Sequence, residues 1–259
     1  MKRFLLIIAC LAWATTAQAQ ATLKPVVGVC HIINNVSCTI TPGVAITSGD
    51  ALVVVVGATT SSATLTSVTA TGHTFTVLDN IGGASQPAAM DAYECNAASG
   101  SPTFTVTTSN LGGGNGTARM YEVQGNATGA CVDGHGGQTQ TSPGTGPNGI
   151  TSGTAISVTT NGEAFIGATF PACCTVPTYT AGTNVAWTNL QQDATNGLAS
   201  EELAQATAAS LKAEFTQSAN QRAATLIIGI LPSGGGGGGS TGTGNKAKKL
   251  CALGVTCGG

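Results

Sequence analysis

Short β-type segments separated by turn-forming residues constrain the fold of this chain more than any other feature. Between residues 22 and 232, runs rich in Val, Ile and Thr alternate with breaks at Gly, Pro, Asn and Ser. Many strands at this spacing are typical of β-sandwiches and barrels. The run 52–56 (LVVVV) is apolar throughout, as expected for a central strand covered on both faces. The sequence therefore predicts an all-β fold, an antiparallel β-sandwich.

The predicted strands share this composition, and they are 24–32, 37–43, 51–59, 74–79, 88–95, 103–109, 117–124, 155–160, 163–170, 210–217 and 223–230. Segment 198–215 is ambiguous, because it is rich in good helix formers and its apolar residues also fit a helical period. The alternation of Leu211, Ala213 and Phe215 with polar residues favours β-structure. We expect a strand here, or a strand after a short helical turn within 198–209.

The N-terminus has the parts of a secretory signal peptide. A short positive region precedes an apolar stretch at 4–14, and a small-residue cleavage site follows at 17–19. The apolar stretch is too short to span a bilayer. The alternative is a lipid-modified Cys10, because the residues before it loosely resemble a bacterial lipobox. We expect residues 1–19 to be a signal peptide and the mature chain, starting at Gln20, to be secreted, extracellular or periplasmic.

Residues 233–259 lack the hydrophobic pattern of a packed domain. The glycine run has no side chains able to pack, so we expect a disordered, flexible linker after a β-sandwich domain at 20–232. Beyond it, three lysines stand beside Cys251 and Cys257. This basic tip is either a tether for an acidic cell-surface polymer or a partner domain, or a terminus without measurable effect.

Charged residues make up only 8% of the chain, against about 25% in an average soluble protein. The few bases between residues 20 and 240 are scattered, and counterion release needs clustered Lys and Arg, so we expect no nucleic-acid partner. No later apolar run approaches the roughly 18 residues of a membrane helix, so we expect no membrane insertion after signal cleavage. The sequence leaves the oligomeric state open.

An even number of cysteines remains if Cys10 leaves with the signal peptide, and in an exported chain this indicates disulfides. Cys30 and Cys38 would face each other across a hairpin that turns at 34–35. Cys251 and Cys257 are expected to close a similar small ring.

The other cysteines are Cys95, Cys131, Cys173 and Cys174. Neighbouring Cα atoms lie about 3.8 Å apart, below the usual disulfide range, so two longer bridges are favoured over a Cys173–Cys174 ring. A zinc site would need a second pair of cysteines or histidines at ligand spacing, and the sequence has none. No metal site is predicted.

The motifs of common enzyme classes are missing: G-x-S-x-G, H-E-x-x-H and G-x-x-x-x-G-K-[ST]. Two pairs of acids qualify by type for sugar hydrolysis, Asp91 with Glu94 and the adjacent glutamates at 201–202, but a solvated strand or loop face explains them as well. Asp133 and His135 would supply two members of a catalytic triad, although a polar turn is the favoured interpretation. We predict no catalytic residue and no cofactor.

Tyr179 and Trp187 are the candidate ligand-binding residues. Sugar rings stack on flat aromatic faces, and both residues lie in a turn-rich segment. Core packing is the competing interpretation. The loop 193–197 (DATNG) is a weaker candidate for calcium, because it contains few carboxylates.

The order of several motifs resembles a jelly-roll-like β-sandwich domain of bacterial and phage-associated secreted and cell-surface proteins. These are SGDALVVVVGA (48–58), MYEVQG (120–125), NGEAFIGATF (161–170), YTAGTNVAW (179–187) and RAATLIIGIL (222–231). Val123 departs from the pattern, which has an aromatic residue after the glutamate, and the cysteines are additions. The resemblance implies a fold and a location, and it carries no catalytic residues.

These observations lead to three functional hypotheses. The first is a secreted, disulfide-bearing, non-catalytic binding or surface-associated module whose partner is a glycan or cell-surface polymer. The second is a secreted carbohydrate-active enzyme, a glycoside hydrolase or lyase. The third is a structural subunit of a fibre or virion. Two close carboxylates in a cleft would favour the enzyme, an exposed Trp187 would favour binding, and an open edge strand would favour assembly.

Overall fold

The computed structural model describes residues 20–234, except 34, 61, 84–85, 110, 112–113, 173–175 and 206. Every regular element in this part is a strand, which confirms the predicted all-β fold. The strands are β1 (Thr22–Leu23), β2 (Gly28–Ile33), β3 (Ser37–Ile40), β4 (Ala51–Ala58), β5 (Leu65–Thr69), β6 (Thr76–Ile81), β7 (Ala88–Glu94), β8 (Phe104–Thr108), β9 (Asn115–Gln124), β10 (Val132–Gln140), β11 (Ile150–Thr151), β12 (Ala164–Pro171), β13 (Tyr179–Ala181), β14 (Thr188–Gln192), β15 (Ala199–Ala204), β16 (Glu214–Gln217) and β17 (Ala223–Ile230). The described residues contain no helix able to cross a membrane. The signal peptide expected at 1–19 and the tail expected at 233–259, apart from residues 233–234, lie outside the described residues.

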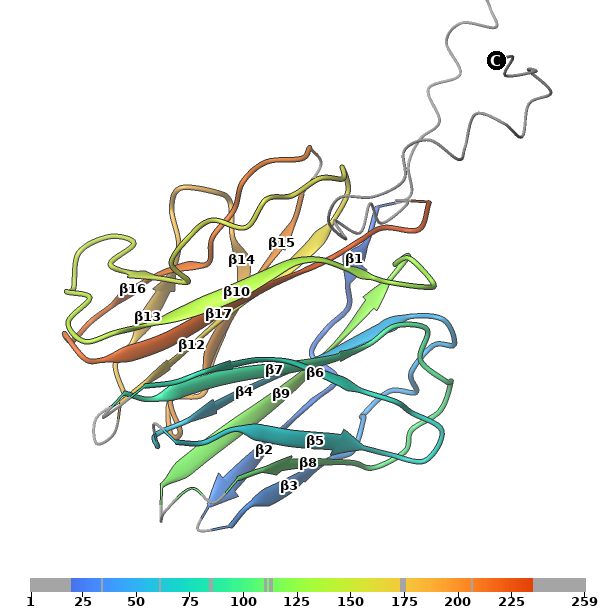
Figure 1. Ribbon diagram of the computed structural model, residues 1–259, viewed down its shortest axis with the longest axis horizontal. Helices are drawn as coiled ribbons and strands as arrows, with labels where there is room; N and C mark the ends of the chain where they lie inside the picture. Colours follow the sequence, from blue (N-terminus) through green and yellow to red (C-terminus); the bar gives the residue numbers. More distant parts are fainter. Residues whose placement is uncertain are drawn as a thin grey trace, which may run out of the picture.

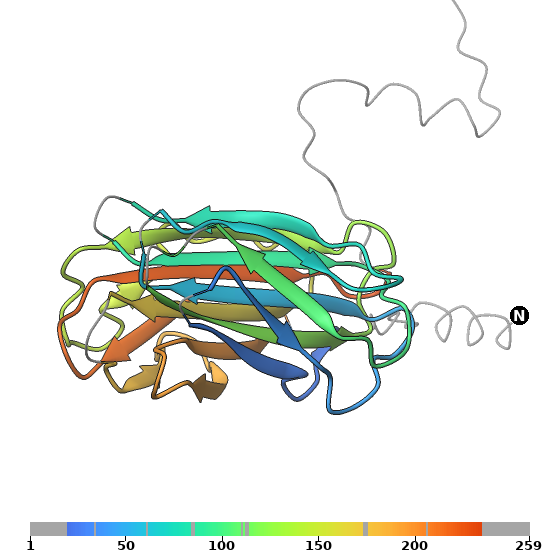
Figure 2. The same ribbon diagram turned by 90° about the horizontal axis from the view of Figure 1, so that it is seen from below.

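The strands form four antiparallel sheets stacked as layers (Figure 1). The first outer sheet has the order β3-β8-β5, and the first inner sheet has the order β1-β9-β4-β7-β6, with β2 also paired to β9. The second inner sheet is β10-β17-β12-β15-β14, and the second outer sheet is β11-β16-β13. Figure 2 shows the molecule from below, where the long strands run along its length.

The two halves of the chain have the same topology. In the first half the paired strands are β2–β9, β3–β8 and β4–β7, and in the second half they are β10–β17, β11–β16 and β12–β15. In each set of eight strands, the first strand pairs with the eighth, the second with the seventh and the third with the sixth. This is the pairing of a long hairpin rolled into a two-sheet jelly roll. The described part of the chain is therefore a pair of jelly-roll-like sandwiches, called here the first (20–124) and the second (126–232), which pack through their inner sheets. This corrects the expectation of a single β-sandwich domain at 20–232.

Alternating burial along β4 explains why the inner sheets stack. Leu52, Val54 and Val56 face the first outer sheet, whereas Ala51, Val53 and Val55 face the second inner sheet. All of β4 is buried, which confirms the expectation of a strand covered on both faces. Gly57 permits the close approach of β4 to the second sandwich, because a Cβ there would lie 2.0 Å from the ring of Phe170.

Two disulfides are present in the described part of the chain. Cys30 is joined to Cys38, but their strands are not hydrogen-bonded to each other as the hairpin hypothesis required; they belong to different sheets, so the bond ties the inner sheet to the outer one. Cys95 is joined to Cys131. This corrects the preference for bridges from both residues to Cys173 and Cys174, which lie outside the described residues.

The Cys95–Cys131 bond connects the two sandwiches. Cys95 directly follows β7 of the first sandwich, and Cys131 directly precedes β10 of the second. Their Cα atoms are 5.8 Å apart, within the usual range for a disulfide. The bond is therefore a second covalent connection between the sandwiches, in addition to the 125–130 segment.

The expectation of β-structure in the ambiguous stretch 198–215 is confirmed: its described residues include β15 and the start of β16 and contain no helix, and β15 completes the second inner sheet. Two other predicted segments turned out differently in the structure. The predicted strand 155–160 is reduced to an isolated bridge between Ile156 and Leu211. The segment interpreted as a polar turn at 133–135 belongs to β10, a nine-residue strand paired along β17.

Candidate functional site

The two predicted ligand-binding aromatics lie in the core of the second sandwich. Tyr179 is 2% exposed and Trp187 is 7% exposed. The Tyr179 ring packs edge-on against Phe215, with centroids 6.3 Å apart. Neither residue presents the open ring face on which a sugar would stack. The glycan platform expected at these positions is therefore wrong, and the competing core interpretation describes them.

Most carboxylic acids also lie inside the protein, not on solvated faces. Eight of the eleven Asp and Glu residues are buried: Asp50, Asp91, Glu94, Glu122, Glu163, Glu201, Glu202 and Glu214. Several accept a hydrogen bond from a backbone N–H of a nearby segment, for example Glu94 from Thr74 and Glu122 from Thr47. These acids act as acceptors for backbone donors that the strands leave unpaired.

The acid pairs suggested by the sequence do not form catalytic pairs. Glu201 and Glu202 are neighbours on β15, so their side chains point to opposite faces of the sheet. Glu201 instead faces β16, where it accepts the backbone N–H of Glu214 at 3.1 Å. In the other pair, Asp91 accepts a hydrogen bond from the N–H of Asp79, whereas Glu94 contacts His73.

Glu201 is a buried acid in the core of the second sandwich. When the two sandwiches are aligned strand by strand through their registers, Ala92 of the first sandwich takes the position of Glu201. Val54 takes the position of Gly167, the residue that pairs with Glu201. A Cβ at Gly167 would lie 3.1 Å from the Glu201 side chain, so this glycine leaves room for it. Burial raises the pKa of Glu201 to about 8, and the nearby Glu214 charge adds to the effect, although backbone N–H donors oppose it.

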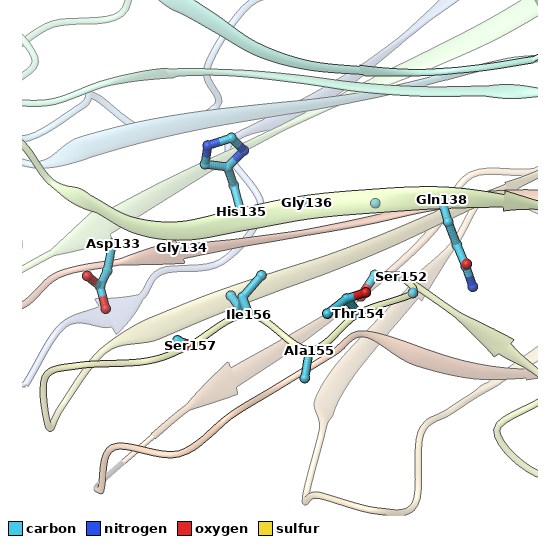
Figure 3. Close-up of a pocket in the computed structure, with 12 residues that line it drawn as sticks. Asp133, Gly134, His135, Gly136, Gln138, Ser152, Thr154, Ala155, Ile156 and Ser157 are labelled. Carbon is cyan, nitrogen blue, oxygen red and sulfur yellow. The ribbon is translucent and has the colours of Figure 1, made fainter. Parts of the chain in front are cut away.

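A polar groove lies on the edge of the second sandwich, between β10 and the segment 152–157. It encloses about 560 Å³. Its lining includes the side chains of Asp133, Gln138, Thr154 and Ile156, together with the glycine-rich backbone of β10. Figure 3 shows Gln138 directed toward the 152–157 side, whereas His135 points the other way. The groove therefore has polar walls and a single large apolar side chain.

The groove exists because the second sandwich is open where the first is closed. In the first sandwich the Cys30–Cys38 bond ties the two sheets together, and a Cβ at Gly28 would lie 2.6 Å from Ile40. The strand registers make Gly136 the counterpart of Gly28. A Cβ at Gly136 would meet nothing nearer than Ile156, at 3.9 Å. No disulfide among the described residues ties the two sheets of the second sandwich to each other, and this space remains.

One end of the groove carries a pair of carboxyl groups. Asp133 lines the groove and accepts hydrogen bonds from the N–H and hydroxyl of Thr159. Glu163 lies behind it, fully buried. Burial raises the pKa of Glu163 to about 8, and the Asp133 charge and hydrogen bond raise it further. Glu163 therefore keeps its proton near neutral pH.

His135 does not form the Asp133–His135 pair that the sequence suggested. Its Nδ1 lies 2.9 Å from a carboxylate oxygen of Asp79, on β6 of the first sandwich. A second such contact joins His31 to Asp193, at 3.2 Å, on the other edge of the interface. The two contacts therefore connect the sandwiches and do not assemble a triad.

The calcium hypothesis at 193–197 receives no support from the geometry. The Asp193 carboxylate accepts the backbone N–H groups of Thr195 and Asn196 in its own turn. Within the described ranges, no three His, Cys, Asp or Glu side chains gather as a metal site would require.

Sequence reasoning missed the groove, because its walls come from a strand without strand-like composition and from an irregular segment. The detectable signal was the internal repeat, in which GVAI at 43–46 returns as GTAI at 153–156. No family model, curated protein or solved structure matches this chain.

Proposed function

We propose that the protein is an exported, non-catalytic binding module that holds a neutral, hydroxyl-rich polymer, such as a glycan, in the groove along β10. The lining of the groove is the observation that supports this proposal. Hydroxyl and amide side chains supply both donors and acceptors, as the hydroxyl groups of a sugar require. The acidic side chain of Asp133 at one end favours a neutral ligand over an acidic one.

The disulfides support the extracellular part of the proposal. Disulfides persist in oxidising compartments, and the two described here tie together sheets and sandwiches. The signal-peptide pattern of residues 1–19 and the resemblance to surface-associated jelly-roll domains agree with export.

A groove-filling variant tests the proposal. Gly136→Val should block the groove without disturbing the fold, because the nearest atom to its Cβ is 3.9 Å away. We expect the wild-type protein to bind at least one member of a panel of neutral polysaccharides in isothermal titration calorimetry, and this variant to lose at least tenfold in affinity.

The matched control is Gly43→Val, a glycine of the first sandwich with no atom within 4 Å of its Cβ position. It should bind as the wild type does. Equal binding by both variants, or no binding to any neutral polysaccharide, would contradict the proposal.

A further inference from the structure

Lys24, Asp50 and Glu122 meet at one end of the first sandwich. The Lys24 Nζ lies 2.6 Å from Asp50 Oδ2 and 2.8 Å from Glu122 Oε1. Lys24 follows β1, Asp50 directly precedes β4, and Glu122 lies on β9. The side chains of the two acids are only 8% and 6% exposed, against 26% for the lysine. An amine and two carboxyl groups are therefore held together with little water around the acids.

The pKa values of the two acids are shifted in opposite directions. Burial raises the pKa of Asp50, and a hydrogen bond with Glu122 raises it further, although Lys24 opposes both effects. Burial also raises the pKa of Glu122, but hydrogen bonds from Lys24 and from the N–H of Thr47 outweigh it, so that the net pKa is lowered. The pKa of Asp50 is therefore shifted upward and that of Glu122 downward, and the lysine contacts both acids directly.

We propose that Lys24 and Asp50 form an intramolecular amide bond between their side chains, with Glu122 as the proton carrier. The Lys24 nitrogen is in contact with the carboxyl group of Asp50, and a protonated carboxyl group is a better electrophile than a carboxylate. Glu122 contacts both partners, which is the position that a general acid–base requires. The bond would be a self-formed modification of the folded chain.

The reaction balances without any co-reactant. The Lys24 ammonium gives one proton to the Glu122 carboxylate, and the free amine attacks the Cγ of protonated Asp50. The nitrogen then loses a second proton, which Glu122 passes to the departing hydroxyl group as the C–O bond breaks. The products are the amide, one water molecule and protonated Glu122, which later releases its proton to solvent.

Two effects oppose the reaction: Lys24 holds its proton, and amide formation is unfavourable in water. Burial lowers the pKa of Lys24, but the two acids outweigh burial and the pKa is raised. The free amine therefore forms only by proton transfer, and Glu122, at 2.8 Å, accepts this proton. Amide formation from free groups in water is unfavourable. Fixed intramolecular partners reach effective concentrations of about 10⁵–10⁸ M, which compensates for this cost.

The second sandwich lacks these components at the equivalent place. The registers make Asp133 the counterpart of Lys24, Glu163 of Asp50, and Gly229 of Glu122. An acid pair without a lysine cannot form this amide. The second sandwich therefore provides an internal control.

Intact mass of the exported, folded protein, measured after disulfide reduction, tests the proposal. We expect a loss of one water molecule that tandem mass spectrometry maps to a link between Lys24 and Asp50. The mapping separates this link from cyclisation of an N-terminal Gln20, which releases ammonia. A folded protein with its full unreacted mass, or a water loss mapped elsewhere, overturns the proposal.

Variants test the roles of the residues. Lys24→Arg and Asp50→Ala should abolish the loss, and Glu122→Gln should abolish it while circular dichroism shows an unchanged strand spectrum. Glu163→Gln in the second sandwich should retain it. An unchanged loss in folded Glu122→Gln would remove Glu122 from the mechanism and so overturn the proposal as stated.

Discussion

Asp91 shows how burial affects a carboxyl group in this protein. It is completely buried; one oxygen accepts the N–H of Asp79 at 2.8 Å, and the other has no partner among the described residues. Burial, together with the nearby Asp79 charge, raises the pKa of Asp91 to about 8. The sequence could not predict this environment, because an acid next to apolar residues on a strand faces the core or the solvent depending on which sheets cover that strand.

Tyr179 provides a test at the same scale. Tyr179→Ala should lower the free energy of unfolding by about 3–5 kcal/mol, the range for truncation of buried aromatic residues. Tyr179→Phe should leave it unchanged or raise it, because the buried hydroxyl group has no hydrogen-bond partner in the described chain. Urea unfolding of both variants measures the difference. A stable Tyr179→Ala variant would show that the ring is not part of the core.

Composition predicted those strands whose own side chains favour β-structure. β4 and β17 are rich in β-branched residues and are buried along their whole length, as their sequences indicate. β10 (VDGHGGQTQ) is not, and it is a strand only because β17 offers a long antiparallel partner. The groove escaped prediction for the same reason, since β10 forms one of its walls. Pairing partners, and with them the Cys95–Cys131 bond, depend on the topology, which composition does not determine.

The two disulfides should differ in their contribution to stability. In the chain-entropy model, closing the 36-residue separation of Cys95 and Cys131 is worth about 4 kcal/mol, against about 2.5 kcal/mol for the 8-residue separation of Cys30 and Cys38. Double Cys→Ala variants of each pair, compared by chemical unfolding, should reproduce this order. Equal losses would mean that strain or structure in the unfolded chain dominates.

For the whole molecule, the buried acids predict an unusual dependence of stability on pH. Asp91, Glu163 and Glu201 have pKa values of about 8 in the folded protein, against reference values of 3.8 for Asp and 4.5 for Glu. Between these limits the folded state binds more protons than the unfolded state. The stability that these groups contribute is therefore complete below about pH 4 and is lost as the pH rises through 8.

We expect the melting temperature to be higher at pH 5.5 than at pH 8.5, in buffers of equal ionic strength. Glu201→Gln should reduce this difference, because its amide does not titrate. Glu122 and Asp193, whose pKa values are lowered, should cause a separate loss of stability at strongly acidic pH. A melting temperature that increases steadily from pH 5.5 to 8.5 would contradict the assignment of the buried acids.

The contacts at Gly125 have a consequence for circular permutation of the chain. The carbonyl oxygen of Gln20 lies beside Gly125, and the N–H of Ser233 donates to the Gly125 carbonyl at 2.6 Å. The start of the first half, the junction between the halves and the end of the second half therefore meet at one point. A short connection from residue 233 to residue 20, with the chain opened at 125, would therefore exchange the order of the two halves while keeping the strand pairs within each sandwich.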